Sequence, residues 1–176
     1  MKKYILLASK FCQGEYEINV DGEIWQDAFQ YLTRNLNQMS IEKSKIHTLW
    51  IENGGHIRHK IKDDDLVLAV LIKVLSKYIG DGLTLYRGEC QFLYKSKKIG
   101  FCWTPDIEVA TMFAKGRNAV ESGGVLLKAY APPSAILAGP NDLSMNQIKE
   151  IEYTCNPNLI QNIEVVQWFE KLHQGY

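Results

Sequence analysis

The stretch Leu83-Thr-Leu-Tyr-Arg-Gly-Glu-Cys90 has the pattern of a buried β-strand that ends at a single cation. Its leucines alternate with Thr84 and Tyr86, which is the period of two expected of a strand. Arg87 follows, and its planar fork of donors suits a phosphate group. Gly88 comes next, and a glycine lets a ligand approach the backbone closely. Taken alone, Arg87 is better interpreted as a surface arginine at a strand end, and other stretches of the chain are needed to favour a phosphate contact.

The composition is that of an ordinary soluble globule. The chain has 176 residues, 46% of them hydrophobic and 23% charged, which fits one domain or one domain with an appended helical lobe. Its formal net charge is zero, and it has no long block of lysine and arginine. A protein that binds nucleic acid without sequence preference usually carries such a surplus, so we do not expect a nucleic-acid partner.

The cysteines and histidines show no metal-binding pattern. His56 and His59 are close in sequence, but no further ligand accompanies them, so no metal site is expected there. The cysteines lack the paired spacing of a zinc site and are predicted to be reduced thiols of a cytosolic protein: Cys12, Cys90, Cys102 and Cys155.

The first residues imitate a signal peptide but fall short of one. The apolar run from Tyr4 to Ala8 is short, and Lys10 places a charge soon after it. No stretch approaches the roughly 20 apolar residues of a membrane span. We therefore expect a cytoplasmic protein with no membrane contact.

The first half of the chain predicts a mainly helical lobe over residues 1–80. Residues 1–20 have no decisive pattern and are interpreted as a short strand or an irregular arm. Residues 52–62 are expected to form a polar loop, because Gly54-Gly55 is typical of a helix end. Apolar residues at helical spacing predict helices over 22–38, 41–51 and 66–79.

The second half, residues 81–176, predicts a β-rich core. Strands outnumber helices here and most connections are short, which indicates an α+β fold with an antiparallel or mixed sheet split into two packed halves. Beyond the first strand, the pattern predicts strands at Ile99–Thr104, Val125–Tyr130, Ile136-Leu137, 148–154 and Ile163–Trp168, a short helix at Ile107–Ala114 and a mobile loop at 115–124.

Two further motifs favour a functional role for Arg87. They are Gly100-Phe-Cys-Trp-Thr-Pro-Asp-Ile-Glu-Val-Ala-Thr-Met-Phe-Ala114 and Ile148-Lys-Glu-Ile-Glu-Tyr153. With Tyr86-Arg87-Gly88, their order and spacing resemble the ADP-ribosyltransferase superfamily, in its arginine–serine–glutamate branch of cholera-like and mono-ADP-ribosylating toxins. The resemblance covers about residues 80–168, and it implies two facing sheets with NAD in the cleft between them.

The resemblance implies a role for each residue of the first motif and its neighbours. The arginine at the position of Arg87 holds a phosphate of NAD, and the backbone of Gly88 is left to hydrogen-bond the nicotinamide amide. Arg117 lies in the loop that covers the bound nucleotide, where a cation suits a pyrophosphate. A solvated arginine is the alternative for Arg117.

The second motif departs from the family pattern at its centre. Cys102 aligns with the serine that normally hydrogen-bonds the catalytic glutamate, and a thiol is a weaker donor than a hydroxyl. Thr104 aligns with the last residue of the family's Ser-Thr-Ser run and keeps a hydroxyl. Phe113, on the inner face of the predicted helix, completes the NAD-binding set that the resemblance implies.

The pair Glu150 and Glu152 would carry the chemistry. Residues two apart on a strand point to the same face, so both carboxylates are expected to project together. By resemblance, Glu152 binds the ribose 2-hydroxyl and stabilises an oxocarbenium-like transition state, and Glu150 orients the acceptor. An edge strand with its charges in water is the alternative interpretation.

The sequence thus predicts an NAD-dependent mono-ADP-ribosyltransferase that modifies an arginine of a target protein. NAD is consumed as a substrate, and this chemistry requires no metal. Two alternatives remain: an NAD glycohydrolase with water as the acceptor, and a nucleotide- or partner-binding module that has lost catalysis through Cys102. A toxin module, a phage-encoded modifier of host proteins and a bacterial regulator all fit this prediction.

Overall fold

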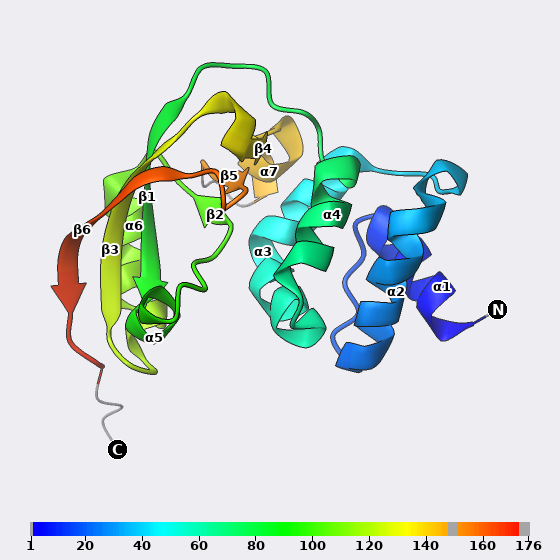
Figure 1. Ribbon diagram of the computed structural model, residues 1–176, viewed down its shortest axis with the longest axis horizontal. Helices are drawn as coiled ribbons and strands as arrows, with labels where there is room; N and C mark the ends of the chain where they lie inside the picture. Colours follow the sequence, from blue (N-terminus) through cyan, green and yellow to red (C-terminus); the bar gives the residue numbers. More distant parts are fainter. Residues whose placement is uncertain (1, 148–150, 173–176) are drawn as a thin grey trace. The chain divides into compact units, whose positions relative to one another are not determined.

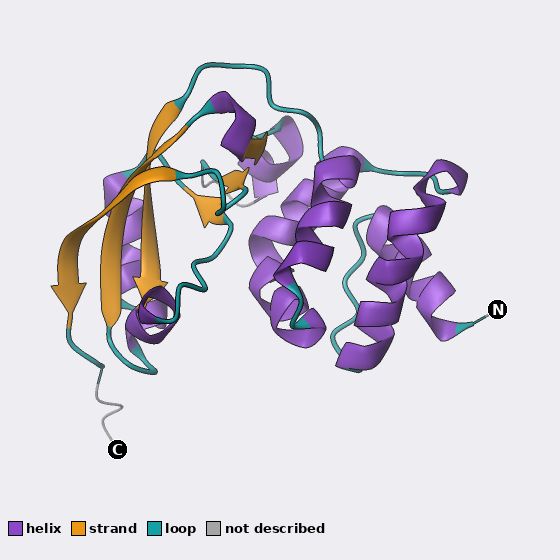
Figure 2. Ribbon diagram, in the orientation of Figure 1, coloured by secondary structure: helices purple, strands orange, loops and turns teal. Residues whose placement is uncertain are grey.

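Helices dominate the chain before residue 78 and strands dominate it afterwards, which confirms the predicted α+β class (Figure 2). The computed structural model describes residues 2–147 and 151–172. Two compact units make up the chain, and each is described by itself. The helical unit is Met1–Lys77 with Asn141–Lys149, and the sheet unit is Tyr78–Pro140 with Glu150–Tyr176.

The helical unit is held by an aromatic core between its first two helices. The ring of Phe11 lies 6.3 Å from that of Trp25 and 4.9 Å from that of Phe29, and all three side chains are fully buried. Buried aromatic pairs of this kind add stability beyond the area that they remove from water. The helices of this unit are α1 Lys3–Cys12, α2 Gly22–Asn35, η1 Leu36–Gln38, α3 Lys43–Ile61, α4 Asp64–Val74 and α7 Asp142–Gln147 (Figure 1).

The expectation of a strand or an irregular arm before residue 20 is wrong, because Lys3–Cys12 forms α1. This helix has 10 residues, and helices of such length are marginal on their own in water. It buries Leu7, Ala8, Phe11 and Cys12, most of them against α2. Tertiary packing therefore decides the secondary structure of a segment whose local sequence pattern was ambiguous.

The expected loop over residues 52–62 is also wrong, because α3 continues through Gly54-Gly55 to Ile61. Gly54 is buried against the indole of Trp50, and a methyl group on it would lie 2.7 Å from that ring's Cε2. A glycine is thus needed inside the helix for packing, and it does not end the helix. The helix ends at Lys62, whose φ of 56° is left-handed.

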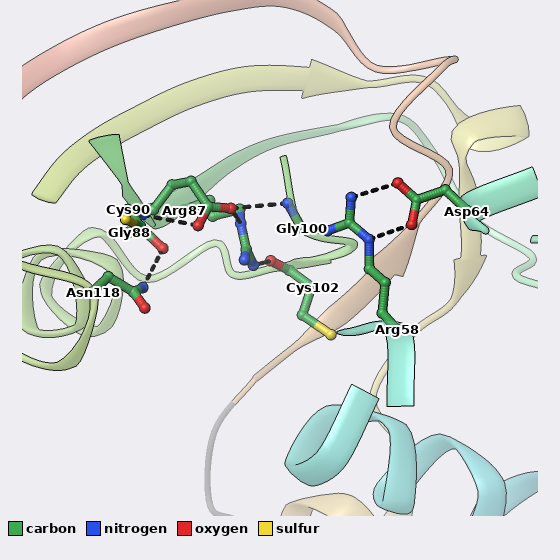
Figure 3. Close-up of polar contacts among 9 residues, drawn as sticks. Arg58, Asp64, Arg87, Gly88, Cys90, Gly100, Cys102 and Asn118 are labelled. Atoms are coloured by element: carbon green, nitrogen blue, oxygen red, sulfur yellow. Dashed lines mark hydrogen bonds and ion pairs between the residues drawn. The ribbon is translucent and has the colours of Figure 1, made fainter. Parts of the chain in front are cut away.

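The turn from α3 to α4 is fixed by acidic side chains. Nε and Nη2 of Arg58 donate to the two carboxylate oxygens of Asp64 at 2.6 and 2.7 Å (Figure 3). Asp63 caps α4, since its side chain accepts a hydrogen bond from the backbone N–H of Leu66 at 2.9 Å. This helix ends at Val74, earlier than the sequence predicted, because Leu75 adopts an extended conformation.

A short helix from much later in the sequence, α7, packs on α3 within the helical unit. Its cap residue Asn141 exchanges hydrogen bonds with Ser144, and its side-chain amide donates to Nδ1 of His47 at 3.4 Å. His47 is 2% exposed, and burial lowers its pKa to about 4. The ring is therefore neutral at physiological pH and can accept this hydrogen bond.

In the described part of the sheet unit, the strands form two antiparallel sheets of three strands each, with orders β1-β3-β6 and β2-β5-β4. The strands are β1 Leu83–Cys90, β2 Cys102–Trp103, β3 Gly124–Ala131, β4 Ile136–Ala138, β5 Tyr153–Cys155 and β6 Gln161–Phe169. The helices are α5 Gln91–Lys95, α6 Ile107–Lys115, η2 Arg117–Ala119 and η3 Pro133–Ala135.

Both sheets contribute to one hydrophobic core. Leu85 and Leu127 enter it from the first sheet, and Trp103 and Cys155 enter it from the second. A single bridge also joins the sheets: the backbone N–H groups of Tyr86 and Thr104 donate to each other's carbonyl oxygens at 2.7 and 2.9 Å. The bridge places the residue after Tyr86, which is Arg87, at the junction between the two sheets.

The elements of the sheet unit differ in detail from those predicted. The predicted strand at 99–104 is reduced to β2 with a bridge at Thr104, and residues 91–95 form α5. The predicted strand at 148–154 is represented by β5, which starts at Tyr153, and residues 148–150 lie outside the described residues. Across the described ranges, none of the helices combines the length and the apolar character that crossing a membrane would need.

The two neighbouring glycines of α3 provide a matched test of its packing. We expect Gly54→Ala to destabilise the protein, because the added methyl group would displace the buried Trp50 ring. Gly55→Ala has nothing within 4 Å of the new methyl group, and alanine favours a helix by about 0.5–1 kcal/mol over glycine. Urea denaturation of both variants should move the midpoint in opposite directions, and a shift of both in the same direction would contradict this packing.

Candidate functional site

Arg87 sits on β1 with its guanidinium committed to two partners. Nε donates to Oε2 of Glu89 at 2.8 Å, and Nη1 donates to the backbone carbonyl of Cys102 at 2.5 Å (Figure 3). The side chain is 19% exposed. Because Cys102 begins β2, this arginine ties the end of the first sheet to the start of the second.

Glu89 is the counter-charge of Arg87, and it is almost completely buried, with 2% of its side chain exposed. Its oxygens also accept hydrogen bonds from the backbone N–H groups of Cys90 and Gly100, each at 2.8 Å. Burial raises the pKa of Glu89. The charge of Arg87 and these hydrogen bonds lower it by more than burial raises it, so the net pKa lies below its usual value. The carboxylate is therefore ionised at neutral pH.

Gly100 lies directly against the guanidinium of Arg87. A methyl group on Gly100 would overlap Nη2 of the arginine, so only a glycine leaves room for it here. Among the described residues, Nη2 has no hydrogen-bond partner, since the two bonds of Arg87 come from Nε and Nη1. Nη2 faces Gly100, where no side chain crowds it.

Cys102, Arg87 and Glu152 form one electrostatic cluster. Burial raises the pKa of the Cys102 thiol well above its usual value, and the negative charge of Glu152 raises it further. Burial lowers the pKa of Arg87, but the charge of Glu89, followed by smaller contributions that include Glu152, brings the net pKa above its usual value. Glu152 directly precedes β5 and is partly buried. Cys102 is therefore a neutral thiol whose pKa is influenced by both a carboxylate and a cation.

Two buried threonines neighbour Cys102, one across the sheet and one two residues along the chain. Cys102 pairs with Thr154 across β2 and β5, and a hydrogen bond with the Thr154 side chain moderates the pKa of the thiol. Thr104 is 3% exposed, and its hydroxyl accepts a hydrogen bond from the backbone N–H of Asp106 at 3.1 Å. That hydroxyl therefore supports the start of α6, whose N-cap is Asp106.

Gly88 is required by packing, whatever its role toward a ligand. A methyl group on it would overlap the backbone of α6 at Ala110 and Ala114, and would lie 2.9 Å from Cβ of Phe113. Its carbonyl oxygen accepts a hydrogen bond from the Asn118 side chain at 2.7 Å (Figure 3). The resemblance left the backbone of Gly88 to hydrogen-bond nicotinamide, and the carbonyl of that backbone is already bonded to Asn118.

The remaining predicted residues are Phe113, Arg117 and Glu150. Phe113 is partly buried on α6 and close to Gly88. Arg117 is exposed at the start of η2, next to the residue that contacts Gly88. Glu150 lies outside the described residues. The structure therefore brings Arg87, Cys102 and Glu152 together, and sets Gly88 and Phe113 beside them along β1 and α6.

Three contributors were not identified in the sequence: Glu89, Gly100 and Asn118. A signal for Glu89 was present, because residues two apart on a strand share a face and Arg87 is followed at that spacing by a carboxylate. No local pattern marks Gly100 or Asn118, since each acts on a residue far away in the chain. Their roles depend on how the loops fold back on β1.

Within the described residues, no group of three or more histidine, cysteine, aspartate or glutamate side chains could hold a metal ion. Comparison of the chain with protein-family models, with curated proteins and with solved structures finds no match.

The buried ion pair can be tested through stability. Glu89→Gln leaves Arg87 without its counter-charge, and breaking such a pair costs about 3–5 kcal/mol of folding free energy. We expect urea denaturation at pH 7 to show a loss of that order. Because the folded pKa of Glu89 is lowered, its contribution is present above the usual carboxyl pKa and is lost as the pH falls through the folded value.

Glu164→Gln is the matched control, because Glu164 is an exposed carboxylate on β6 of the same sheet. Exposed substitutions of this kind change stability by about 0.5 kcal/mol or less. Equal losses in the two variants would show that the Glu89 carboxylate has no special role.

Proposed function

We propose that the protein is an NAD-dependent mono-ADP-ribosyltransferase that transfers ADP-ribose from NAD to an arginine of a target protein. The observation that supports this proposal is the cluster of Arg87, Cys102 and Glu152, which come from three separate stretches of the sequence. These are the positions that the resemblance marks as arginine, serine and glutamate. We further propose that the two sheets correspond to the split sandwich of that superfamily, with NAD between them.

Glu152 is proposed to act on the ribose. The bond between nicotinamide and ribose breaks, nicotinamide leaves with the electron pair, and positive charge develops on the ribose. A carboxylate that accepts a hydrogen bond from the 2-hydroxyl stabilises this charge. The acceptor nitrogen then forms the new bond to the ribose and loses a proton.

Arg87 is proposed to meet a phosphate of NAD through Nη2, since Nε and Nη1 are engaged by Glu89 and Cys102. Partial burial strengthens such a contact, because fewer water molecules compete for the nitrogen. The Glu89 carboxylate keeps the guanidinium in a fixed orientation and leaves one edge of it free. Arg117, exposed at the start of η2, is proposed to contact the pyrophosphate.

A nucleotide- or partner-binding module is the second candidate, and a specific observation favours it. Cys102 offers a neutral thiol where the family pattern has a hydroxyl, and the carbonyl of Gly88 is occupied by Asn118. A thiol donates only a weak hydrogen bond, so it would hold the glutamate less firmly. Binding of NAD without release of nicotinamide would support this second candidate, and release without labelled protein would support an NAD glycohydrolase.

The central test is Glu152→Gln in a nicotinamide-release assay with NAD. Loss of one well-placed group at the transition state typically lowers the rate by about 10²–10³. We expect a loss of that order with the binding of NAD, measured by calorimetry, little changed. Glu164→Gln is the control and should retain full activity, because its carboxylate is exposed on the edge strand β6. Full activity in folded Glu152→Gln would refute the assignment.

Glu150 allows the transferase to be separated from the hydrolase. If Glu150 orients the acceptor, Glu150→Gln should lose most labelling of protein from labelled NAD and keep much of its nicotinamide release, because orientation contributes only to the transfer step. Both activities are to be measured on one purified preparation, with Glu152→Gln beside it. Equal loss of both activities would contradict the proposed division between the two glutamates.

A further inference from the structure

The edge of β1 that faces away from β3 bonds to partners outside its own sheet. β1 is an edge strand, since the order of its sheet is β1-β3-β6. In an antiparallel ladder, the backbone groups of every second residue point to the same side of the strand. Tyr86 points to the side away from β3, because its N–H and carbonyl bond to Thr104. Gly88, two residues further on, therefore presents its carbonyl to the same edge.

Asn118 is the partner of the Gly88 carbonyl at this edge. Its Nδ2 donates to that oxygen at 2.7 Å (Figure 3). Backbone acceptors withdrawn from water are rarely left unbonded, so this contact serves the edge of the strand as well as the turn. Asn118 is partly buried in the middle of η2, Arg117–Ala119. The bond therefore fastens η2 to β1, two residues beyond the bridge that joins the two sheets.

The next residue, Ala119, holds the turn through its backbone. Ala119 has no exposed surface, and its N–H donates to the carbonyl of Gly116 at 3.0 Å. Its carbonyl accepts hydrogen bonds from the N–H groups of Leu172 at 3.1 Å and Gly123 at 3.2 Å. The middle of the segment 116–123 is thus bonded on both sides, although the sequence predicts a mobile loop there.

Ser122 fastens the end of the same segment to α5. Its Oγ accepts a hydrogen bond from the backbone N–H of Phe92 at 3.0 Å and lies 3.1 Å from Sγ of Cys90. Phe92 belongs to the first turn of α5, and Cys90 is the last residue of β1. Side chains therefore hold the segment to neighbouring elements at two separate points, Asn118 and Ser122.

We infer that Asn118 and Ser122 are positioning residues, which hold the segment 116–123 on β1 and α5 and so present Arg117 from a fixed turn. The proposed contact of Arg117 with the pyrophosphate is then made by a preset part of the site, not by a loop that has to close over NAD. A preset turn avoids the entropy cost of ordering the backbone when the ligand binds. This inference rests on the proposed function for its effect on NAD, but the hold on the segment can be measured separately.

The chain offers a matched control for each anchor. Asn118→Ala removes the donor to Gly88, and Asn158→Ala makes the same change at an exposed position between β5 and β6. Ser122→Ala removes the acceptor for the N–H of Phe92, and Ser96→Ala makes the same change at an exposed position that follows α5.

The first measurement is hydrogen exchange of the full-length protein, followed by mass spectrometry of its peptides. We expect exchange in the peptide 116–124 to be at least about tenfold faster in Asn118→Ala and in Ser122→Ala, because local opening is easier once a hydrogen bond is lost. The peptide 125–131, which covers β3, should exchange as in the wild type and so shows that the variants are folded. Both control variants should match the wild type throughout. Unchanged exchange of 116–124 in both anchor variants would overturn the inference whatever the activity.

The second measurement is steady-state release of nicotinamide from NAD. We expect KM for NAD to rise about two- to tenfold in Asn118→Ala with kcat little changed, because the long side chain of Arg117 must then be ordered when the ligand binds. Arg117→Gln should also raise KM, and adding Asn118→Ala to it should raise KM no further, since the two residues act through one contact.

Two kinetic results would overturn positioning through Arg117. One is a further increase of KM in the double variant, which would show that Asn118 acts independently of Arg117. The other is a lower KM in Asn118→Ala, which would show that its amide obstructs the Gly88 carbonyl. If the wild type itself releases no nicotinamide, the proposed function fails, while the exchange experiment still decides whether Asn118 and Ser122 hold the segment.

Discussion

An arginine side chain withdrawn from water needs a negative charge beside it, and in the sheet unit Glu89 supplies that charge to Arg87. The pair does more than neutralise itself. Glu89 also holds the backbone at Gly100, and Arg87 holds the backbone at Cys102. The two side chains thus determine how the connection from β1 returns to β2. The thiol of Cys102 and the carboxylate of Glu152 interact electrostatically with Arg87, so the buried ion pair is central to the candidate site.

The same pair commits part of the Arg87 guanidinium to the fold. A guanidinium has five N–H groups in a fixed fork, and here Nε and Nη1 serve the fold. Nη2 makes no hydrogen bond among the described residues, and Gly100 gives it room. An arginine fixed in this way is preorganised, since it need not lose rotational freedom when an anion binds. The proposed contact with a phosphate of NAD would use this fixed guanidinium, whose positive charge Glu89 balances.

Packing also requires the glycine at position 88. Its lack of a side chain lets α6 approach β1, and this close approach brings Phe113 next to the strand. The carbonyl of Gly88 is taken by Asn118 from the segment that follows α6. The resemblance assigns Gly88 to a ligand, but packing against α6 is enough to explain why a glycine stands at this position.

The sequence by itself determined the α+β class and the strand that carries Arg87, because alternation over Leu83–Cys90 and helical spacing over Gly22–Asn35 are local properties. It also determined the order of Arg87, Cys102 and Glu152, since spacing along the chain needs no tertiary contact. The continuation of α3 through Gly54 depended on the buried ring of Trp50. The role of Glu89 depended on the return of Gly100 to its carboxylate, and the association of Asn141–Lys149 with the helical unit depended on α3. These features were decided only by tertiary structure, because each arises where a residue meets a partner that local pattern does not specify.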